Sequence, residues 1–284
     1  MLPDAVSSLR CPVCKGPLAL AGTEPAALRC ASGHSFDAAK QGYFNLLTGK
    51  GTAFEADTAE MVAARSDFLD AGHYSPLAAA IAELTGPALS RPGAVVLDSG
   101  TGTGHYLHTV LSRWPAASIG IDISKFALRR AARLNREAVN LVWDVWRPLP
   151  LAKQSVDAVM VVFAPRNPSE FARVLRPGGR LVVVTPRQGH LSEIAERTGM
   201  LGIESGKDER LAESMREFFV QGETVQLDIG LELSGRDLAD VAFMGPAGHH
   251  LDRTALFAAT GGESAVQATA KFAINAFSAR GYGT

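Results

Sequence analysis

The chain has 284 residues, of which 46% are hydrophobic and 20% are charged, and its formal net charge is −1. The length fits one large domain or two unequal ones, and the composition indicates a globular protein with a substantial core. The near-neutral charge gives no overall attraction for nucleic acids, so any such surface has to be local. No apolar run reaches the ~20 residues of a membrane span and no signal-peptide pattern begins the chain, so we expect a cytoplasmic protein with no membrane partner.

All three cysteines lie within the first thirty residues. Cys11 and Cys14 form a C-x-x-C knuckle, and Cys30 and His34 add two further ligands after a gap of fifteen residues. This is the donor set of a closed, structural zinc site, and the ion would stabilise a segment too small to fold unaided. The alternatives are three unrelated thiols beside a surface histidine, or a redox pair, which would need an adjacent βαβ pattern. We therefore predict a zinc-ribbon module over residues 1–47.

The segment after His34 mixes aromatic and polar side chains. Lys40 and Tyr43 are typical of a surface that holds phosphates and stacks RNA bases. Alternatively, the aromatic residues Phe36, Tyr43 and Phe44 pack inward. Both interpretations remain open from the sequence.

Residues 48–93 are predicted to be a glycine-rich linker followed by two helices. Helical spacing extends over residues 57–70, with Asp57 or Thr58 as the N-cap, and again over residues 76–84. These helices lead to the first strand of a larger domain, residues 94–284.

The stretch 94–104 reads A-V-V-L-D-S-G-T-G-T-G, which predicts a buried strand, an acidic residue and a loop that approaches a ligand closely. Helical spacing follows over residues 105–114, so this is a strand–loop–helix unit suited to a nucleotide-like cofactor. The pattern differs from the dinucleotide G-x-G-x-x-G and resembles motif I of S-adenosylmethionine-dependent methyltransferases; a tight structural turn is the alternative. The candidate cofactor-binding residues of the loop are Asp98, Gly100, Gly102, Thr103 and Gly104.

Four further strands are predicted over residues 118–122, 141–144, 156–163 and 181–184. The first ends in Asp122, whose carboxylate can accept both ribose hydroxyls of a nucleoside or cap the next helix. The second ends in Asp144, which matches the methyltransferase position that meets the adenine amino group, although an acid there can simply begin a loop. Trp143 or Val145 could pack on the adenine ring.

A proline-stiffened loop follows the strand 156–163. Arg166 and Asn167 in this loop would be available to a target base or to the RNA backbone, unless the segment is only a turn that precedes a helix.

The C-terminal third alternates apolar residues over 218–233 and 265–279, which predicts antiparallel strands that close the sheet, with helices near 237–244 and 253–259. The loop 245–250 contains two histidines and is either a metal or substrate loop or a solvated turn. The fold class is therefore α/β, a Rossmann-like class I methyltransferase sheet with a small N-terminal zinc ribbon.

Three motifs together resemble the family of 23S rRNA guanine-N1 methyltransferases over nearly the whole chain. They are the Cys₃His ribbon, Q-G-Y-F-N-L-L at 41–47, and M-x₃-R followed by F-L-D-A-G-H-Y, which ends at Tyr74. The resemblance implies that Tyr74 and His190 lie beside the cofactor and makes Arg65 a candidate substrate contact. An aromatic closing a helix pair and a surface or capping histidine are the alternatives.

The resemblance implies methyl transfer from S-adenosylmethionine to N1 of a guanine in hairpin 35 of 23S rRNA, with a homodimer as a further expectation. The motifs F-A-P-R-N-P and V-T-P-R-Q-G-H are similar to the Gram-positive branch with tylosin-resistance members, which implies macrolide resistance. No residue identifies itself as the acceptor of the guanine N1 proton. The alternative functions are a small-molecule methyltransferase and a non-catalytic zinc-ribbon RNA-binding protein.

Overall fold

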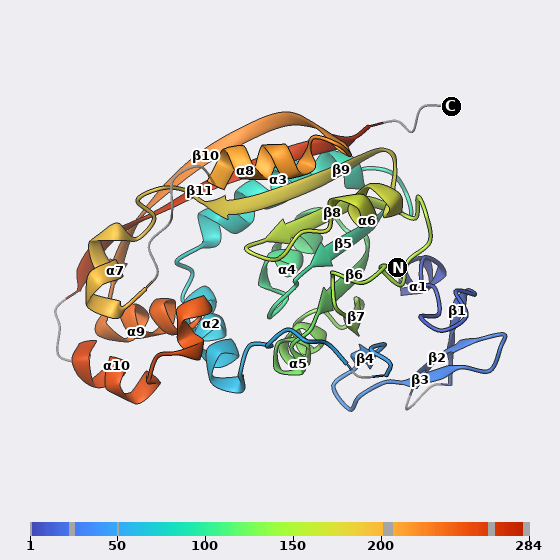
Figure 1. The fold of residues 1–284 in the computed structure, drawn as a ribbon, viewed down its shortest axis with the longest axis horizontal. Helices are drawn as coiled ribbons and strands as arrows, with labels where there is room; N and C mark the ends of the chain where they lie inside the picture. The colour runs from blue at the N-terminus through green and yellow to red at the C-terminus, as the bar shows by residue number, and fades with distance from the viewer. Residues whose placement is uncertain (1, 23–25, 50, 201–206, 261–264, 281–284) are drawn as a thin grey trace.

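The computed structural model describes residues 2–22, 26–49, 51–200, 207–260 and 265–280. Within them, an eight-stranded sheet with helices on both faces carries a small three-stranded ribbon at one end (Figure 1). In the described part of the chain, no helix has the length and apolar character needed to cross a membrane.

The ribbon sheet consists of β1 (Leu18–Ala21), β2 (Ala27–Cys30) and β3 (Ser35–Asp37). The main sheet consists of β4 (Phe44–Asn45), β5 (Val95–Ser99), β6 (Ala117–Asp122), β7 (Val139–Val142), β8 (Val156–Val162), β9 (Leu175–Pro186), β10 (Phe219–Leu233) and β11 (Val266–Ala279). The helices are α1 (Leu2–Ser7), α2 (Ala59–Asp70), α3 (Ser75–Leu89), α4 (His105–Arg113), α5 (Lys125–Leu134), α6 (Pro168–Val174), α7 (Ser192–Thr198), α8 (Lys207–Met215), α9 (Gly235–Phe243) and α10 (Arg253–Thr260), with a 3₁₀ helix η1 (Pro246–His249).

The strand order of the main sheet is β10-β11-β9-β8-β5-β6-β7-β4. The pairs from β9 to β4 are parallel, whereas β11 pairs antiparallel with both β9 and β10. The two predicted C-terminal strands therefore close the sheet as expected. The chain runs outward from β5 through β6 and β7 and then returns to the other side of β5 with β8. Open α/β sheets bind ligands at such a switch point, at the carboxyl ends of the strands.

The central strand β5 is buried on both faces of the sheet. Val95 and Leu97 join the apolar cluster that contains α1 and α6, whereas Val96 joins the cluster that contains α3 and α4. This alternation follows from the two-residue period of a strand and explains the uninterrupted apolar run in the sequence.

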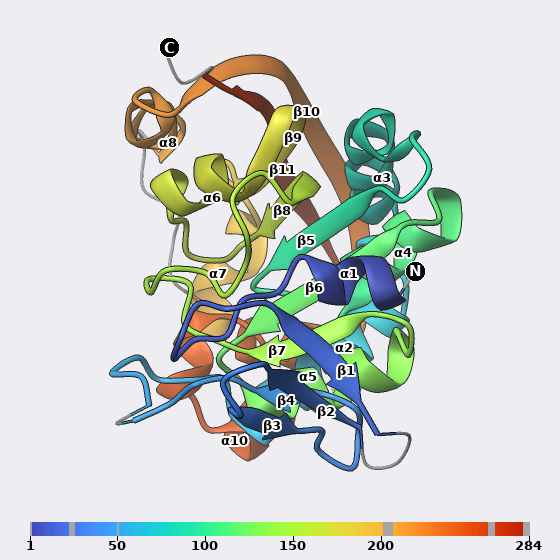
Figure 2. The same ribbon diagram turned by 90° about the vertical axis from the view of Figure 1, so that its right-hand side faces the viewer.

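The ribbon is continuous with the main sheet. Ala5 and Leu9 of the N-terminal segment belong to the core cluster of β5, β6 and β7, and the backbone N–H of Arg10 donates to the carbonyl of Pro150 at 2.8 Å. β4 then pairs with β7, with Phe44 opposite Leu141 (Figure 2). The described part of the N-terminal module thus shares one core with the sheet, which the sequence did not predict.

The helices α2 and α5 are both capped at their N-termini by hydroxyl groups. The Thr58 side chain accepts a hydrogen bond from the Met61 N–H at 3.2 Å, and the Ser124 side chain accepts one from Ala127 at 3.3 Å. Asp57, the other N-cap candidate of α2, is instead ion-paired with Arg65.

Candidate functional site

The four predicted metal ligands come together in the ribbon. The Sγ atoms of Cys11, Cys14 and Cys30 and one ring nitrogen of His34 all lie within 4.8 Å of one another. Cys30 Sγ is 3.3 Å from His34 Nδ1, and Cys14 Sγ is 3.6 Å from Cys30 Sγ. These separations fit the edges of a tetrahedron around zinc with Zn–S bonds of about 2.3 Å.

The knuckle also favours the thiolate form of its exposed cysteine. The backbone N–H of Gly16, with the Ser32 side chain, lowers the pKa of Cys14 to about 6. Both the spacing and the chemistry of the donors therefore fit a structural zinc ion.

The aromatic residues after the ribbon pack inward. Tyr43 is buried against Leu128 and Ala132 of α5, and Phe44 is buried in the main sheet. Base stacking by Tyr43 is therefore not supported, because its ring is covered by the apolar side of a helix. Lys40, in the same segment, is exposed.

The glycine loop after β5 is tied to the acidic end of β6. Gly100 and Gly102 have φ values of 80° and 55°, in the left-handed region that favours glycine. Oδ2 of Asp122 accepts a hydrogen bond from the Gly102 N–H at 2.9 Å, while Oδ1 accepts one from the Ser124 N–H at 2.8 Å. Asp122 thus organises both the loop and the start of α5.

Two of the predicted loop residues lie behind the loop. Asp98 is buried and accepts a hydrogen bond from the Thr101 hydroxyl at 2.8 Å, and burial raises its pKa to about 7. A Cβ on Gly104 would lie 2.7 Å from Nδ2 of Asn135, so this glycine permits close packing against α5. Neither residue lines the cavity described next. Their contribution is to hold the loop in shape.

A cavity of about 1060 Å³ lies over the loop at the carboxyl ends of the parallel strands. Its volume is at the upper end of ligand pockets, which leaves room for a nucleoside cofactor and a second ligand. A Cβ on Gly102 would meet no atom closer than 3.8 Å, so the backbone is open toward this space. The predicted site residues that line it are Arg65, Tyr74, Gly100, Gly102, Thr103, Asp122, Asp144, Arg166 and His190.

The residues present fit S-adenosylmethionine. Asp122 offers a carboxylate for ribose hydroxyls at the edge of an open glycine backbone, which is how such folds bind a nucleoside. Asp144 supplies a second acid at the end of the neighbouring strand. Trp143 and Val145 line the cavity beside it, and packing of either residue on the adenine ring stays a prediction.

A segment that includes Thr52 and Asp57 passes beside these acids. The Thr52 hydroxyl donates to Oδ2 of Asp144 at 2.9 Å, and the Ser124 hydroxyl donates to the Asp57 carbonyl at 2.9 Å. Phe54 packs on Trp146 with ring centroids 6.3 Å apart. The segment predicted to be a linker is therefore anchored at the cavity.

Arg65 lines the cavity beside the glycine loop. Its guanidinium pairs with Asp57 and donates to the carbonyl of Met244 at 2.6 Å. It is also the group that a Cβ on Gly102 would approach most closely, at 3.8 Å. Arg65 thus connects α2, the glycine loop and the end of α9. The predicted RNA contact of Arg65 stays a prediction.

Tyr74 and His190 form part of an aromatic wall. The Tyr74 ring lies 5.0 Å from Phe272, and the His190 ring lies 4.9 Å from the same phenylalanine. Burial raises the pKa of Tyr74 well above its ordinary value and lowers the pKa of His190 to about 4. Nδ1 of His190 is held by the backbone of Lys271, 3.0 Å from its nitrogen. Both side chains are therefore neutral at pH 7.

The loop after β8 brings an exposed ring and a cation to the cavity. Phe163 has φ of 55°, and 45% of its surface is exposed. Arg166 lines the cavity with no acidic partner among the described residues, and burial lowers its pKa. Asn167 donates to the Val145 carbonyl at 2.9 Å and so holds the loop in place.

Among the aromatic residues of the cavity that the sequence interpretation missed, three are exposed: Phe54, Trp146 and Phe163. The available signal was the position of two of them, since Phe163 ends one predicted strand and Trp146 comes two residues after the end of another. Aromatic residues at strand ends are also common in cores, so only their exposure in the fold singles them out.

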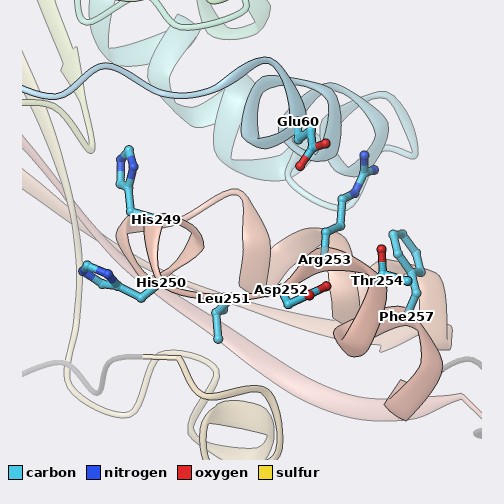
Figure 3. A pocket seen from close by; sticks show the side chains of 8 residues that line it. All are labelled: Glu60, His249, His250, Leu251, Asp252, Arg253, Thr254 and Phe257. Carbon is cyan, nitrogen blue, oxygen red and sulfur yellow. The ribbon is translucent and has the colours of Figure 1, made fainter.

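The histidine-containing loop 245–250 forms η1 and borders a second, polar depression of about 800 Å³. Figure 3 shows Glu60 of α2 on one side and His249, His250 and Arg253 on the other. His249 lies 3.5 Å from Glu55 and also lines the main cavity. The metal-type cluster found in the described residues is that of the ribbon, so a metal role for this loop is not supported.

Comparison with known proteins agrees with this geometry. Residues 9–49 match the family described as RlmA, N-terminal, and residues 96–179 match the methyltransferase domain. The 23S rRNA (guanine(748)-N(1))-methyltransferase of Streptomyces fradiae is 44% identical over 257 residues, covering 89% of each chain. A Micromonospora griseorubida protein, provisionally named 23S rRNA (guanine-N(1)-)-methyltransferase, is 46% identical and covers 91% of this chain and 92% of its own.

A solved structure has the same fold. One chain of the complex between the Haloferax volcanii Trm112 methyltransferase activator and a methyltransferase is 19% identical, with a TM-score of 0.51. The match covers 80% of this chain and 99% of that one.

Proposed function

The chain belongs to the family of 23S rRNA (guanine-N1)-methyltransferases, and we propose that its methyl transfer takes place in the cavity over the glycine loop. The observation that carries this proposal is the hydrogen bond from the Gly102 N–H to Asp122. It places a carboxylate beside an open glycine backbone at the switch point of the sheet. The cavity leaves room for a second ligand beside these two residues, as a two-substrate reaction requires.

S-adenosylmethionine, when bound, supplies a methyl group on a positively charged sulfur. We assign its nucleoside part to Asp122 and Asp144. The neutral state of His190 is favourable here, because a protonated imidazole in the same cavity would repel the sulfonium charge. The pKa of about 4 keeps the ring uncharged throughout the physiological range.

We place the target guanine against Phe163. N1 of guanine lies on the Watson–Crick edge, so the base must leave its helix before it can react. An unstacked base regains stabilisation on an aromatic face, worth about 1–3 kcal/mol. The Phe163 ring meets this need because it is exposed within the cavity, 5.5 Å from Phe272 behind it. Its positive φ is the kind of backbone strain that functional sites retain.

We propose that Arg166 stabilises the deprotonated guanine. Guanine N1 carries a proton at neutral pH, and transfer of this proton to water leaves negative charge on the base. The guanidinium of Arg166 has no acidic partner among the described residues, so its charge is available to that anion. Because the site is partly desolvated, the interaction is stronger there than in water.

We further propose, from the motif resemblance described above, that the target lies in hairpin 35 and that methylation confers resistance to tylosin-type macrolides. The similar Streptomyces fradiae protein is named for methylation of N1 of guanine 748 in 23S rRNA. The cytoplasmic location and the homodimer remain predictions, which cell fractionation and light scattering test.

Primer extension on 23S rRNA from cells with and without this protein tests the proposed function. Methylation at N1 blocks Watson–Crick pairing, so reverse transcriptase is expected to stop one nucleotide before the modified guanine only when the protein is present. Identical extension products from both cell types would contradict the proposal.

A further inference from the structure

The exposed face of α5 carries a concentration of positive charge unlike the rest of the chain. Between Asp122 and Glu137 the sequence contains no acidic residue. The exposed cations of this stretch are Lys125, Arg129, Arg130, Arg133 and Arg136, which we call the α5 basic face. The whole chain, in contrast, has a net charge of −1.

These cations are free of ion pairs within the part of the chain that the structure describes. Two exposed arginines elsewhere, in contrast, have acidic partners: Arg113 pairs with Glu83, and Arg216 pairs with Glu213. Four of these unpaired cations lie on the roughly three turns of α5 and Arg136 follows its end. They repel one another, since like-charge neighbours at helical spacing are destabilising. Binding of an anion reduces this repulsion.

The α5 basic face lies between the cavity and the ribbon. The N-cap of α5, Ser124, comes two residues after Asp122. Its hydroxyl donates a hydrogen bond to the carbonyl of Asp57, in the segment beside the cavity. On the buried side of α5, Leu128 and Ala132 pack against Tyr43 of the segment after the ribbon. In the ribbon diagram, α5 lies beside β4, which follows this segment (Figure 2). Exposed Lys40 lies in that segment. A polyanion could therefore contact the ribbon, α5 and the mouth of the cavity along one path.

Apolar groups accompany the charges. Phe126 is 43% exposed and Leu134 is 42% exposed, and the guanidinium of Arg129 lies over the Phe126 ring at 5.3 Å from its centroid. Phosphates, sugars and splayed bases present this combination of anionic and apolar surface. An acidic protein would match the charges but gives no reason for the exposed ring beneath an arginine.

We propose that the α5 basic face binds the phosphate backbone of the 23S rRNA segment that flanks the target guanine. The inference rests on the proposed function, because the RNA must be the one whose base enters the cavity. Phosphate contacts fix the register of a nucleic acid on a protein, whereas base contacts specify it. The face would thus position the RNA while the cavity selects the base.

The test compares two double variants of the full-length, zinc-loaded protein. Arg129→Gln with Arg133→Gln removes two charges from the α5 basic face, and Arg113→Gln with Arg216→Gln removes two exposed charges from α4 and the C-terminal side of α8. Binding of a protein-free 23S rRNA transcript is measured from 50 to 300 mM salt, together with binding of S-adenosylmethionine and the melting temperature.

For the α5 variant, we expect RNA affinity near 100 mM salt to fall about 10- to 30-fold, and the slope of log K against log salt to become shallower by about 1.4 to 1.8. The control variant should behave as wild type, and S-adenosylmethionine affinity should be unchanged in both. An unchanged affinity and salt slope in the folded α5 variant would overturn the inference, and so would an equal loss in the control. If wild-type protein methylated no guanine, the proposed function would fail first, which is a separate result.

Discussion

The backbone N–H of Gly102 donates a hydrogen bond to Oδ2 of Asp122 at 2.9 Å, which joins the loop after β5 to the end of β6. The other carboxylate oxygen accepts the Ser124 N–H at 2.8 Å. Because both oxygens are held by backbone groups of different elements, the carboxylate has one orientation before any ligand arrives. Preorganisation of this kind reduces the entropy lost on binding.

Replacing this carboxylate tests its role. Asp122→Asn removes the charge and one of the two acceptor oxygens, so we expect S-adenosylmethionine to bind about 10- to 100-fold more weakly. Isothermal titration calorimetry measures the change. Asp228→Asn, at an exposed acid on β10, is the matched control and should bind as wild type. Equal affinities for Asp122→Asn and wild type would remove Asp122 from the cofactor site.

The buried acid behind the loop predicts a pH-dependent stability. Burial raises the pKa of Asp98 from 3.8 to about 7, so between these values the folded protein binds more protons than the unfolded chain. The contribution of Asp98 to stability is therefore fully present below about pH 4 and is lost as the pH rises through 7.

Asp98→Asn should remove this dependence while keeping an acceptor for the Thr101 hydroxyl. Relative to wild type, we expect the variant to gain about 1–4 kcal/mol of unfolding free energy between pH 4 and 8. Urea denaturation at several pH values gives both curves. Parallel curves for the two proteins would show that Asp98 does not titrate in this range.

The strands of the main sheet show how much of the fold the sequence could predict. The apolar runs of β5 to β9 and the alternation of β10 and β11 predicted every strand of the main sheet except β4. Strand β4 was missed because it is two residues long and its pairing with β7 depends on residues almost a hundred positions away. Likewise, nothing local in the sequence shows that α1 packs into the core of the sheet.

The site shows the same division between local and distant information. The spacing of Cys11, Cys14, Cys30 and His34 is a local signal, and the structure brings these residues together. The spacing of the glycines could not show that Gly104 packs on α5 instead of facing the cavity. Packing of this kind is decided by tertiary contacts, as is the exposure of Phe163.

The ribbon's metal should stabilise more than the ribbon. His34→Ala removes one of the four ligands, so we expect the bound zinc measured by atomic emission to fall from about one ion per chain toward none. Because the N-terminal segment shares its core with β5 to β7, the melting temperature of the whole protein should fall too. His250→Ala, outside the ligand cluster, should keep its zinc. Full zinc occupancy in His34→Ala would contradict the assignment.

The exposed Phe163 ring should contribute to the reaction with the RNA substrate. For Phe163→Leu, we expect kcat/KM for rRNA to fall about 5- to 100-fold, since a leucine side chain offers no aromatic face to the base. Phe163→Tyr should retain most of the activity, and Phe257→Leu on α10 should leave it unchanged. If the leucine and tyrosine variants were equally active, stacking on this ring would not contribute to the reaction.

The most direct test of the central claim uses purified protein, protein-free 23S rRNA and S-adenosylmethionine with a deuterated methyl group. Nucleosides from the digested RNA are then separated and identified by mass spectrometry. We predict deuterium-labelled N1-methylguanosine with the wild-type protein and much less of it with Asp122→Asn at limiting cofactor. Label on another atom or nucleoside, or equal labelling by both proteins, would contradict the account.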